Sequence, residues 1–383
     1  MGFTSQDDLI NQITVNGKYR RIEMAKTTTP VHTAGGWHLL TGLAGSPSAG
    51  TFPGTDLLWI NCTETSGDGT TIIGPQHGGN VSTATKHILN VGASLVAAAG
   101  APWQAKLVDL QGYYRLSTTN VTGTGSRVLI NTNTFTANAG TDVITYTNDF
   151  ANLTRVRLTT TTTLPAGLSL ATDYWLIRQS ATTAKLASSL SNAIAGTAID
   201  ITDAGTGTHT LTIQMPRYQD GVGCEAFFVS VTQPTAGGPN LTASAYTSTN
   251  NGGSRAFQGT PTMGATADAY ATRVLHSGNA AGRYGAFLPK QGSDTGIARV
   301  DSFTWSAGTA YTGTGVVALC IAKPLLDIPI PVSGMWSERD LVNQLISLPQ
   351  IQDGACLQWM LFGTGATTAN SPMVSTLDVA WGG

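Results

Sequence analysis

The stretch DVITYTNDFANLTRVRLTTTTTLPAGLSLATDYWLIR, residues 142–178, shows the pattern that decides the fold class. Short runs rich in Val, Ile, Leu, Thr and aromatic residues alternate with turns that contain Asn, Gly or Pro. Such runs predict β-strands, because branched and aromatic side chains fit a pleated, half-buried surface. The strands expected within this stretch are Asp142–Tyr146, Arg155–Thr160 and Tyr174–Arg178.

The same pattern extends along the chain in both directions. The 45 Gly and 16 Pro residues divide the sequence into short segments. Further strands are expected at Arg127–Asn131, Ala226–Val231, Val316–Ile321 and Cys356–Phe362. Many short strands joined by turns are typical of sandwiches and barrels. We therefore predict an all-β protein whose host domain, residues 20–115 and 216–383, is a jelly-roll-like β-sandwich.

Residues 117–214 are expected to form an inserted small β domain. Their composition shifts to Thr, Asn, Ala and Gly with few aromatic residues, and aromatic-rich sequence resumes at Met215–Tyr218. An insertion between neighbouring strand ends is tolerated, because loop-closure entropy grows only slowly with loop length.

Two segments break the β pattern and predict short helices, Ser5–Ile13 and Ser337–Leu345. Their sequences, SQDDLINQI and SERDLVNQL, are identical at five of nine positions. Each begins with a Ser that can cap a helix and has an Asp three residues later, a variant of the capping box. The similarity is compatible with a duplication or with two similar caps.

Residues 1–19 are expected to form an N-terminal arm that contains the first of these helices. Leu9, Ile10 and Ile13 lie on one helical face and are a candidate interface. A nine-residue helix is shorter than the ~12–15 residues needed for marginal stability alone, so this face needs a partner. The partner is either a neighbouring molecule or the host domain itself, beside the Ser337–Leu345 helix.

The charge content argues against several partners. Charged residues make up 11% of the 383 residues, and the formal net charge is −2. Nucleic acid is not an expected partner, because the densest basic cluster is Lys18, Arg20 and Arg21, which reads as a solvated strand end. No membrane association is expected either, since no 18-residue apolar run and no signal peptide are present.

No catalytic constellation is found, and we expect no enzyme activity. The segment Gly252–Ala256 resembles a nucleophile elbow but ends in Ala and lies in a Gly/Asn turn. The phosphate-binding glycine motifs are absent. The four cysteines, Cys62, Cys224, Cys320 and Cys356, lie far apart and are expected to be reduced and mostly buried.

Metal sites are weakly indicated, and no cofactor is expected. His77, Asn80 and His87 could contribute to a metal site, but ordinary packing at a turn explains them better because a third ligand is lacking. Asp68, Asp203 and Asp294 lie in glycine-rich turns, where Asx turns are the favoured interpretation over calcium binding. The eight Trp residues are expected to be core or interface anchors, with sugar-stacking platforms as a further possibility.

Residues 156–211 resemble a small β module that recurs inside phage tail and capsid proteins. The similarity rests on LPAGLSLATDYWLIR, residues 164–178, and TDAGTGTHTL, residues 202–211. The segments Gly2–Gly17, Gly78–His87 and Ser337–Ala355 resemble structural proteins of tailed-phage virions, of the capsid decoration or cement-like kind. No long helix is expected, which departs from the commonest phage shell fold and favours a protein attached to the shell.

This resemblance implies a virion location, after assembly in the cytoplasm of a host bacterium. The function it favours is capsid decoration, with the major capsid protein and copies of the chain itself, as a homotrimer, as partners. A tail fibre, tube or adaptor is the alternative. A polysaccharide-binding or depolymerase component remains a third hypothesis, which the scattered acidic residues neither support nor exclude.

Overall fold

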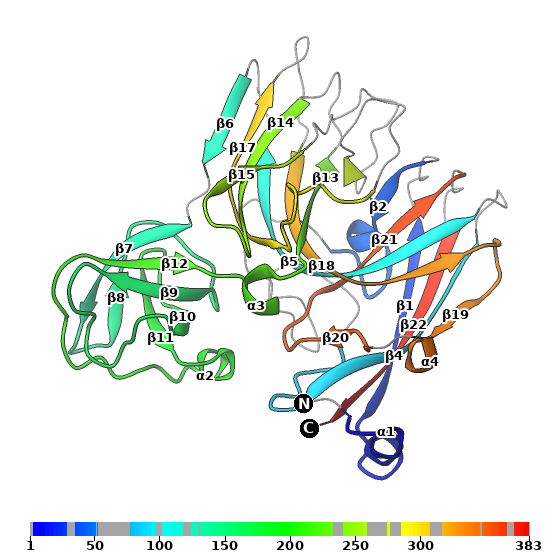
Figure 1. The fold of residues 1–383 in the computed structure, drawn as a ribbon, viewed down its shortest axis with the longest axis horizontal. Helices are drawn as coiled ribbons and strands as arrows, with labels where there is room; N and C mark the ends of the chain where they lie inside the picture. Colours follow the sequence, from blue (N-terminus) through cyan, green and yellow to red (C-terminus); the bar gives the residue numbers. More distant parts are fainter. Residues whose placement is uncertain are drawn as a thin grey trace.

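The fold was analysed in a computed structural model, which describes residues 3–28, 35–50, 52, 77–96, 102–117, 124–128, 131–232, 240–258, 274–275, 285–306, 316–344, 347–365 and 371–382. Strands dominate it and the helices are few and short (Figure 1). The prediction of an all-β protein is confirmed.

Eight strands form the host β-sandwich: β1 (Tyr19–Thr28), β2 (Trp37–Leu39), β4 (Thr85–Leu95), β5 (Trp103–Ser117), β18 (Val316–Ile330), β19 (Ser337–Asp340), β21 (Leu357–Gly363) and β22 (Ser371–Gly382). One sheet has the order β19-β4-β22-β1 and the other β18-β5-β21-β2. The first strand pairs with the eighth, the second with the seventh, the third with the sixth and the fourth with the fifth. These pairings describe an antiparallel ribbon folded over into two sheets, so the predicted jelly roll is confirmed.

Smaller elements border the two sheets. The strands β3 (Gly45–Ser46) and β20 (Gln350–Ile351) pair with β1 and β4, and a 3-10 turn, η1 (Leu40–Gly42), follows β2. The inward-facing side chains of both sheets pack into one core that includes Ile22, Val91, Leu107, Ile328 and Leu377. This core arises because alternate residues of each strand point to the same face.

Everything between β5 and β18 is an insertion into the jelly roll. Among its described residues, the strands outside the barrel are β6 (Thr124–Val128), β13 (Glu225–Thr232), β14 (Asn240–Ser248), β15 (Ser254–Ala256), β16 (Val274–Leu275) and β17 (Ile297–Ser306). The strands β13 and β16 extend the second sheet beyond β18, whereas β15-β14-β17-β6 form a separate sheet. The run Val316–Ala322 is continuously apolar because core residues cover both faces of the strand that it forms.

A closed six-stranded barrel lies within this insertion, beside the sandwich (Figure 1). Its strands and helix are β7 (Thr132–Asn138), β8 (Val143–Thr145), β9 (Arg155–Thr160), β10 (Asp173–Arg178), β11 (Thr183–Ala187), α2 (Leu190–Ile194) and β12 (His209–Ile213). The sequence placed the start of the inserted domain at residue 117. However, β6 pairs with β17 and not with the barrel, so the barrel strands begin only at Thr132.

A buried ion pair connects the chain after the barrel to the sandwich. The guanidinium of Arg217, next to α3 (Tyr218–Gly221), donates to both carboxylate oxygens of Asp109 in β5, at 2.8 and 2.9 Å. The Tyr218 hydroxyl and the Cys356 backbone N–H donate to the same carboxylate, at 2.7 and 2.8 Å. Burial and the neighbouring Asp109 raise the pKa of Tyr218 well above its usual value, so the phenol keeps the proton that it donates.

Two further arginines fix the barrel to α3. Arg155 and Arg157 of β9 both bind Asp173 of β10 and Asp220 of α3, with Arg157 Nη1 at 2.8 Å from Asp220. The barrel and the sandwich are therefore joined by charged contacts on both sides of α3, besides the apolar core that they share.

The first predicted helix is confirmed as α1 (Gln6–Thr14), with Ser5 as its cap. The Ser5 hydroxyl accepts from the Asp8 backbone N–H at 3.0 Å, while the Asp8 carboxylate accepts from the Thr4 N–H at 2.9 Å. The expected capping box is thus present, except that the Asp8 carboxylate binds the N–H of Thr4, the residue before the cap, and not that of Ser5.

The range of the second predicted helix is wrong. Ser337–Asp340 is strand β19, paired with β4, and only Leu341–Gln344 forms a helix, α4. Asp340, not Ser337, caps it by accepting from the Val342 N–H at 3.0 Å. Pairing with β4 satisfies more backbone groups than one extra helical turn would, so long-range pairing overrides the local capping signal.

Candidate interaction surface

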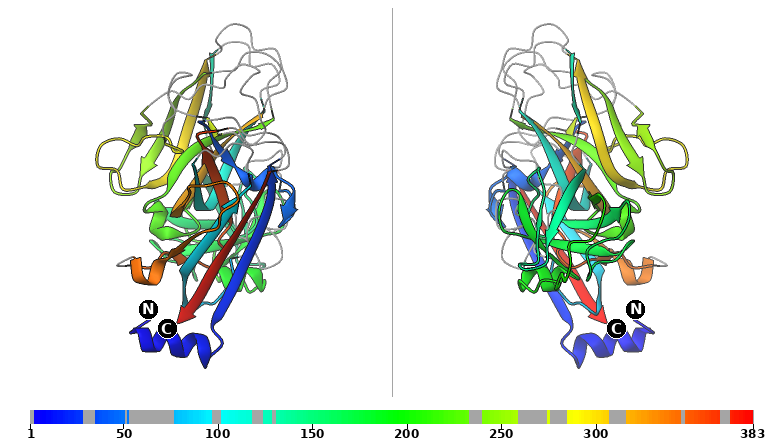
Figure 2. Two further views of the ribbon diagram at one scale, coloured as in Figure 1. Left: turned by 90° about the vertical axis from the view of Figure 1, so that its right-hand side faces the viewer. Right: turned by 90° about the vertical axis from the view of Figure 1, so that its left-hand side faces the viewer.

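The candidate interface residues of α1 divide between two faces. Leu9 is buried against Leu89 and Ala380, and Ile13 packs on the same cluster, which also contains Val342 of α4. Ile10 points away and is 56% exposed. Leu9 and Ile13 thus pack on the host domain beside the segment that resembles them. Figure 2 shows α1 at one end of the sandwich, next to both chain ends.

This packing predicts that Leu9→Asp combined with Ile13→Asp lowers the melting temperature of the isolated protein. The change removes a buried Leu contact worth about 1.5–3 kcal/mol and part of a second, and α1 is too short to persist undocked. Ile10→Asp is the matched control on the same helix and should leave the melting temperature unchanged. Equal melting temperatures for both variants would contradict the intramolecular role of α1.

The outward face of the sheet β19-β4-β22-β1 has a polar half near the start of β1. Arg21 forms a bidentate pair with Asp378 at 2.8 and 2.9 Å, and the Tyr19 hydroxyl donates to the same carboxylate. Asn90 joins Asp378 to Glu338 on the neighbouring strands. Burial opposes ionisation of Asp378, but the bonds from Arg21 and Tyr19 outweigh it and lower the pKa of that carboxyl.

Exposed apolar side chains lie on β22, just after the end of β4 and on the turn before β19. They are Val96, Val332, Met335, Trp336 and Val374, each between 41% and 59% exposed. The Trp336 ring lies over Gly92 of β4, where a Cβ atom would come within 2.3 Å of the ring. The turn that carries Trp336 is held by a hydrogen bond from the Gly334 N–H to the Leu95 carbonyl, 2.8 Å long. We call these five residues the Trp336 patch; it is a rigid apolar surface of the kind that marks interaction sites.

The histidines considered for a metal site do not meet. His77 is buried with its Nδ1 3.0 Å from the Lys86 amine, whereas His87, the residue after Lys86 on β4, packs on Phe3. Asn80 accepts a hydrogen bond from the Gly354 N–H at 3.0 Å. Within the described ranges, no three His, Cys, Asp or Glu side chains are grouped so that they could hold a metal ion.

The acidic turn residues have protein partners. Asp203 accepts from the N–H groups of Ala166 and Gly205, both at 2.8 Å, which lowers its pKa and makes it an Asx turn. Asp294 is buried and accepts from Tyr246, Asn251 and Arg255. Asp68 lies outside the described residues.

The other sequence candidates are distributed through the fold. Gly252–Ala256 spans the end of the turn after β14 and the whole of β15. Cys224, Cys320 and Cys356 are buried free thiols, while Cys62 lies outside the described residues. Trp37, Trp103 and Trp359 are core residues. None of the described helices has the length and apolar character required to cross a membrane.

Some of the most constrained residues were not anticipated from the sequence. Lys86 is buried and donates to the His77 and Gly79 carbonyls, and Lys26 is buried with three backbone carbonyls around its amine. The Asp109–Arg217 pair was also missed. Single charged residues at such positions are indistinguishable in sequence from solvated ones, because the fold, and not a local sequence pattern, brings their partners to them.

Comparisons with known proteins found remote structural similarities. No family model and no curated protein matches the sequence. A structure of infectious bursal virus derived T=1 particles is 9% identical, covers 94% of this chain and 77% of that chain, and has a TM-score of 0.18. The structure of the Gx strain of infectious bursal disease virus is 8% identical, covers 94% and 80%, and has a TM-score of 0.16. TM-scores this low carry no argument about the fold or the function of this chain.

Proposed function

We propose that this chain is a structural protein of a tailed-phage virion that decorates the outside of the head shell. The observation that carries the proposal is the Trp336 patch, which a rigid sheet presents on a chain with only 11% charged residues. Jelly rolls are common in viral capsid proteins. The fold supports the proposal only by analogy, so the proposal depends on the patch.

In this role the chain acts by binding and needs no catalysis. The apolar patch would dock on the major capsid protein, and the polar half of the same sheet face would form the rim of the contact. Binding only to the assembled shell would stabilise it by mass action. Copies of the chain would meet around the local symmetry axes of the shell, with a homotrimer as the proposed unit.

Copy number tests the proposal directly. We expect quantitative mass spectrometry of purified virions to find on the order of hundreds of copies per particle, since decoration follows the shell lattice. About six or twelve copies would instead indicate a ring in the tail and contradict head decoration. Absence from purified virions would overturn the structural role altogether.

A further inference from the structure

His87 of β4 is a titratable side chain that the N-terminal arm covers. Its neighbours on the strand point into the sandwich, Lys86 toward His77 and Ile88 into the core. Alternation along the strand therefore directs His87 to the outer face of the sheet. There the Phe3 ring lies over it, with the ring centroids 5.5 Å apart, and the His87 side chain is buried. An ionisable group is thus enclosed between a sheet and a short arm.

Apolar contacts hold the arm on this face. A Cβ atom on Gly382 of β22 would lie 3.0 Å from two carbons of the Phe3 ring, so the ring rests directly on the strand. Leu9 of α1 packs nearby on Leu89 and Ala380. Since α1 has only nine residues, it is marginal as a helix by itself and depends on these contacts.

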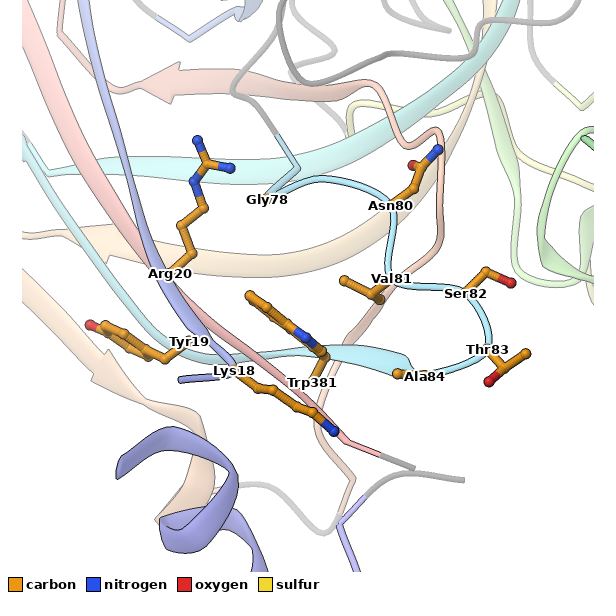
Figure 3. A pocket seen from close by; sticks show the side chains of 10 residues that line it. All are labelled: Lys18, Tyr19, Arg20, Gly78, Asn80, Val81, Ser82, Thr83, Ala84 and Trp381. Carbon is orange, nitrogen blue, oxygen red and sulfur yellow. The ribbon is translucent and has the colours of Figure 1, made fainter. Parts of the chain in front are cut away.

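A glycine joins the arm to β1. Gly17 has a φ of +63°, and in the described part of the chain nothing beyond its two neighbours lies within 4 Å of the position of a Cβ atom. The next residue is fixed to the sheet, because the Lys18 carbonyl accepts from the Trp381 N–H at 3.2 Å. Both residues line a pocket of about 490 Å³ where β1 begins and β22 ends (Figure 3). Release of the arm would break the turn at Gly17, with its bond from the Lys18 N–H to the Gln12 carbonyl, and leave β1 in place.

No described carboxylate forms an ion pair with His87. In α1, the bond from the Thr4 N–H keeps the pKa of Asp8 below its usual 3.8. In β22, burial opposes ionisation of Asp378, but the bonds from Arg21 outweigh it and lower the pKa of that carboxyl too. Both groups therefore stay ionised in the range where a histidine titrates. Residues 347–351, which include β20, carry no charge. The other charged residues near the arm are Asp7, Lys18 and Asp340.

Burial lowers the pKa of His87 below its usual 6.5 and outweighs the Leu348 backbone, which favours the protonated ring. A histidine of this kind is neutral while it is covered and takes up a proton more readily when it is uncovered. Docking of the arm is therefore at full strength above pH 6.5, and it weakens as the pH falls below 6.5 and through the pKa of the covered ring.

We propose that the N-terminal arm is a pH-dependent latch, which protonation of His87 releases from the sheet. A charged imidazole under the Phe3 ring would be a buried charge without a counter-charge. Once the arm has left, water can hydrate the ring. Release also exposes the apolar side chains of Leu9 and Ile13, which in the docked arm face the host domain. The proposal does not depend on the virion role.

Hydrogen exchange of the full chain tests the latch, followed by mass spectrometry from about pH 7.5 to about pH 5 and corrected for the intrinsic exchange rates. Protection of residues 3–14 should fall as the pH decreases below about 6.5, by up to about tenfold per pH unit, the limit for one proton. Strand β9 of the barrel is the internal reference and should keep its protection. Unchanged protection of the arm, or an equal loss in β9, would overturn the proposal.

Variants assign the response to His87. His87→Phe keeps an aromatic ring under Phe3 but cannot take up a proton, so its arm should be equally protected over the whole pH range. His209→Phe, at a buried histidine of the barrel, is the matched control and should keep the pH response of the unchanged chain. A pH response that persists in His87→Phe would refute the latch.

If His87→Phe does not fold, an NMR titration of the His87 ring in the unchanged chain replaces it. The pKa of the ring should lie below 6.5. It should rise toward 6.5 in Phe3→Ala, because that change uncovers the ring. Equal pKa values in the two chains would show that the arm does not control the ionisation of His87, and the proposal would be wrong.

Discussion

Asp109→Asn is expected to lower the free energy of unfolding by about 3–5 kcal/mol, the loss typical when one partner of a buried ion pair is removed. The Arg217 side chain is 3% exposed and that of Asp109 is fully buried, so the guanidinium would keep its charge without a counter-charge or access to water. The same change weakens the bonds from Tyr218 and Cys356. Urea unfolding followed by far-UV circular dichroism measures the effect.

The control for this prediction is the exposed pair between Arg178 and Asp149 on the barrel, whose side chains are 34% and 54% exposed. Asp149→Asn should change stability by at most about 1 kcal/mol, because water screens the pair. If Asp109→Asn and Asp149→Asn shifted the urea midpoint equally, the buried pair would not be what holds the insertion to the sandwich.

Trp336→Ala combined with Val374→Asp is expected to weaken attachment to the head shell by roughly 30- to 700-fold, or about 2–4 kcal/mol, the range of tryptophan hot spots. The two side chains are 46% and 41% exposed in the isolated chain, so its melting temperature should fall less than after a substitution in the core. Binding of purified protein to undecorated heads, measured by co-sedimentation, gives the affinity.

Leu170→Asp is the matched control, because Leu170 is 58% exposed but lies on the barrel, away from the Trp336 patch. It should attach normally. If the patch variant also bound with unchanged affinity, the outward face of this sheet would not be the attachment surface, and the proposed mode of decoration would be wrong.

Local patterns were sufficient to predict much of the secondary structure. Arg155–Thr160 was expected as a strand and is β9, and the Ser5 cap marked the start of α1. The expected strand Val316–Ile321 is shorter than the observed one, and Pro324 and Pro329 would by themselves argue against a longer strand. In the structure β18 continues to Ile330. Pro324 lies at a bulge, and β13 pairs with β18 no further than Ala322, so the N–H groups that the prolines lack are not needed for pairing with β13.

Such local patterns do not predict which strands pair with each other when they are far apart in the sequence. The composition shift located the barrel, but nothing in Thr124–Val128 indicates that its partner is β17, far along the chain. The same limit applies to the surfaces. The eight Trp residues are spaced singly, and only the fold shows that Trp103 is buried while Trp336 covers a glycine on the outside.

The position of β22 has a consequence for how the chain folds during synthesis. This strand is made after all other strands of the jelly roll, yet it lies between β1 and β4 in the middle of its sheet. The barrel needs only residues 132–213 and can close while translation continues. At about 5–20 residues per second, the ribosome needs roughly ten to thirty seconds more to release β22. Throughout that interval the facing edges of β1 and β4 lack their shared partner, and their unpaired backbone N–H and C=O groups are open to wrong strand pairing.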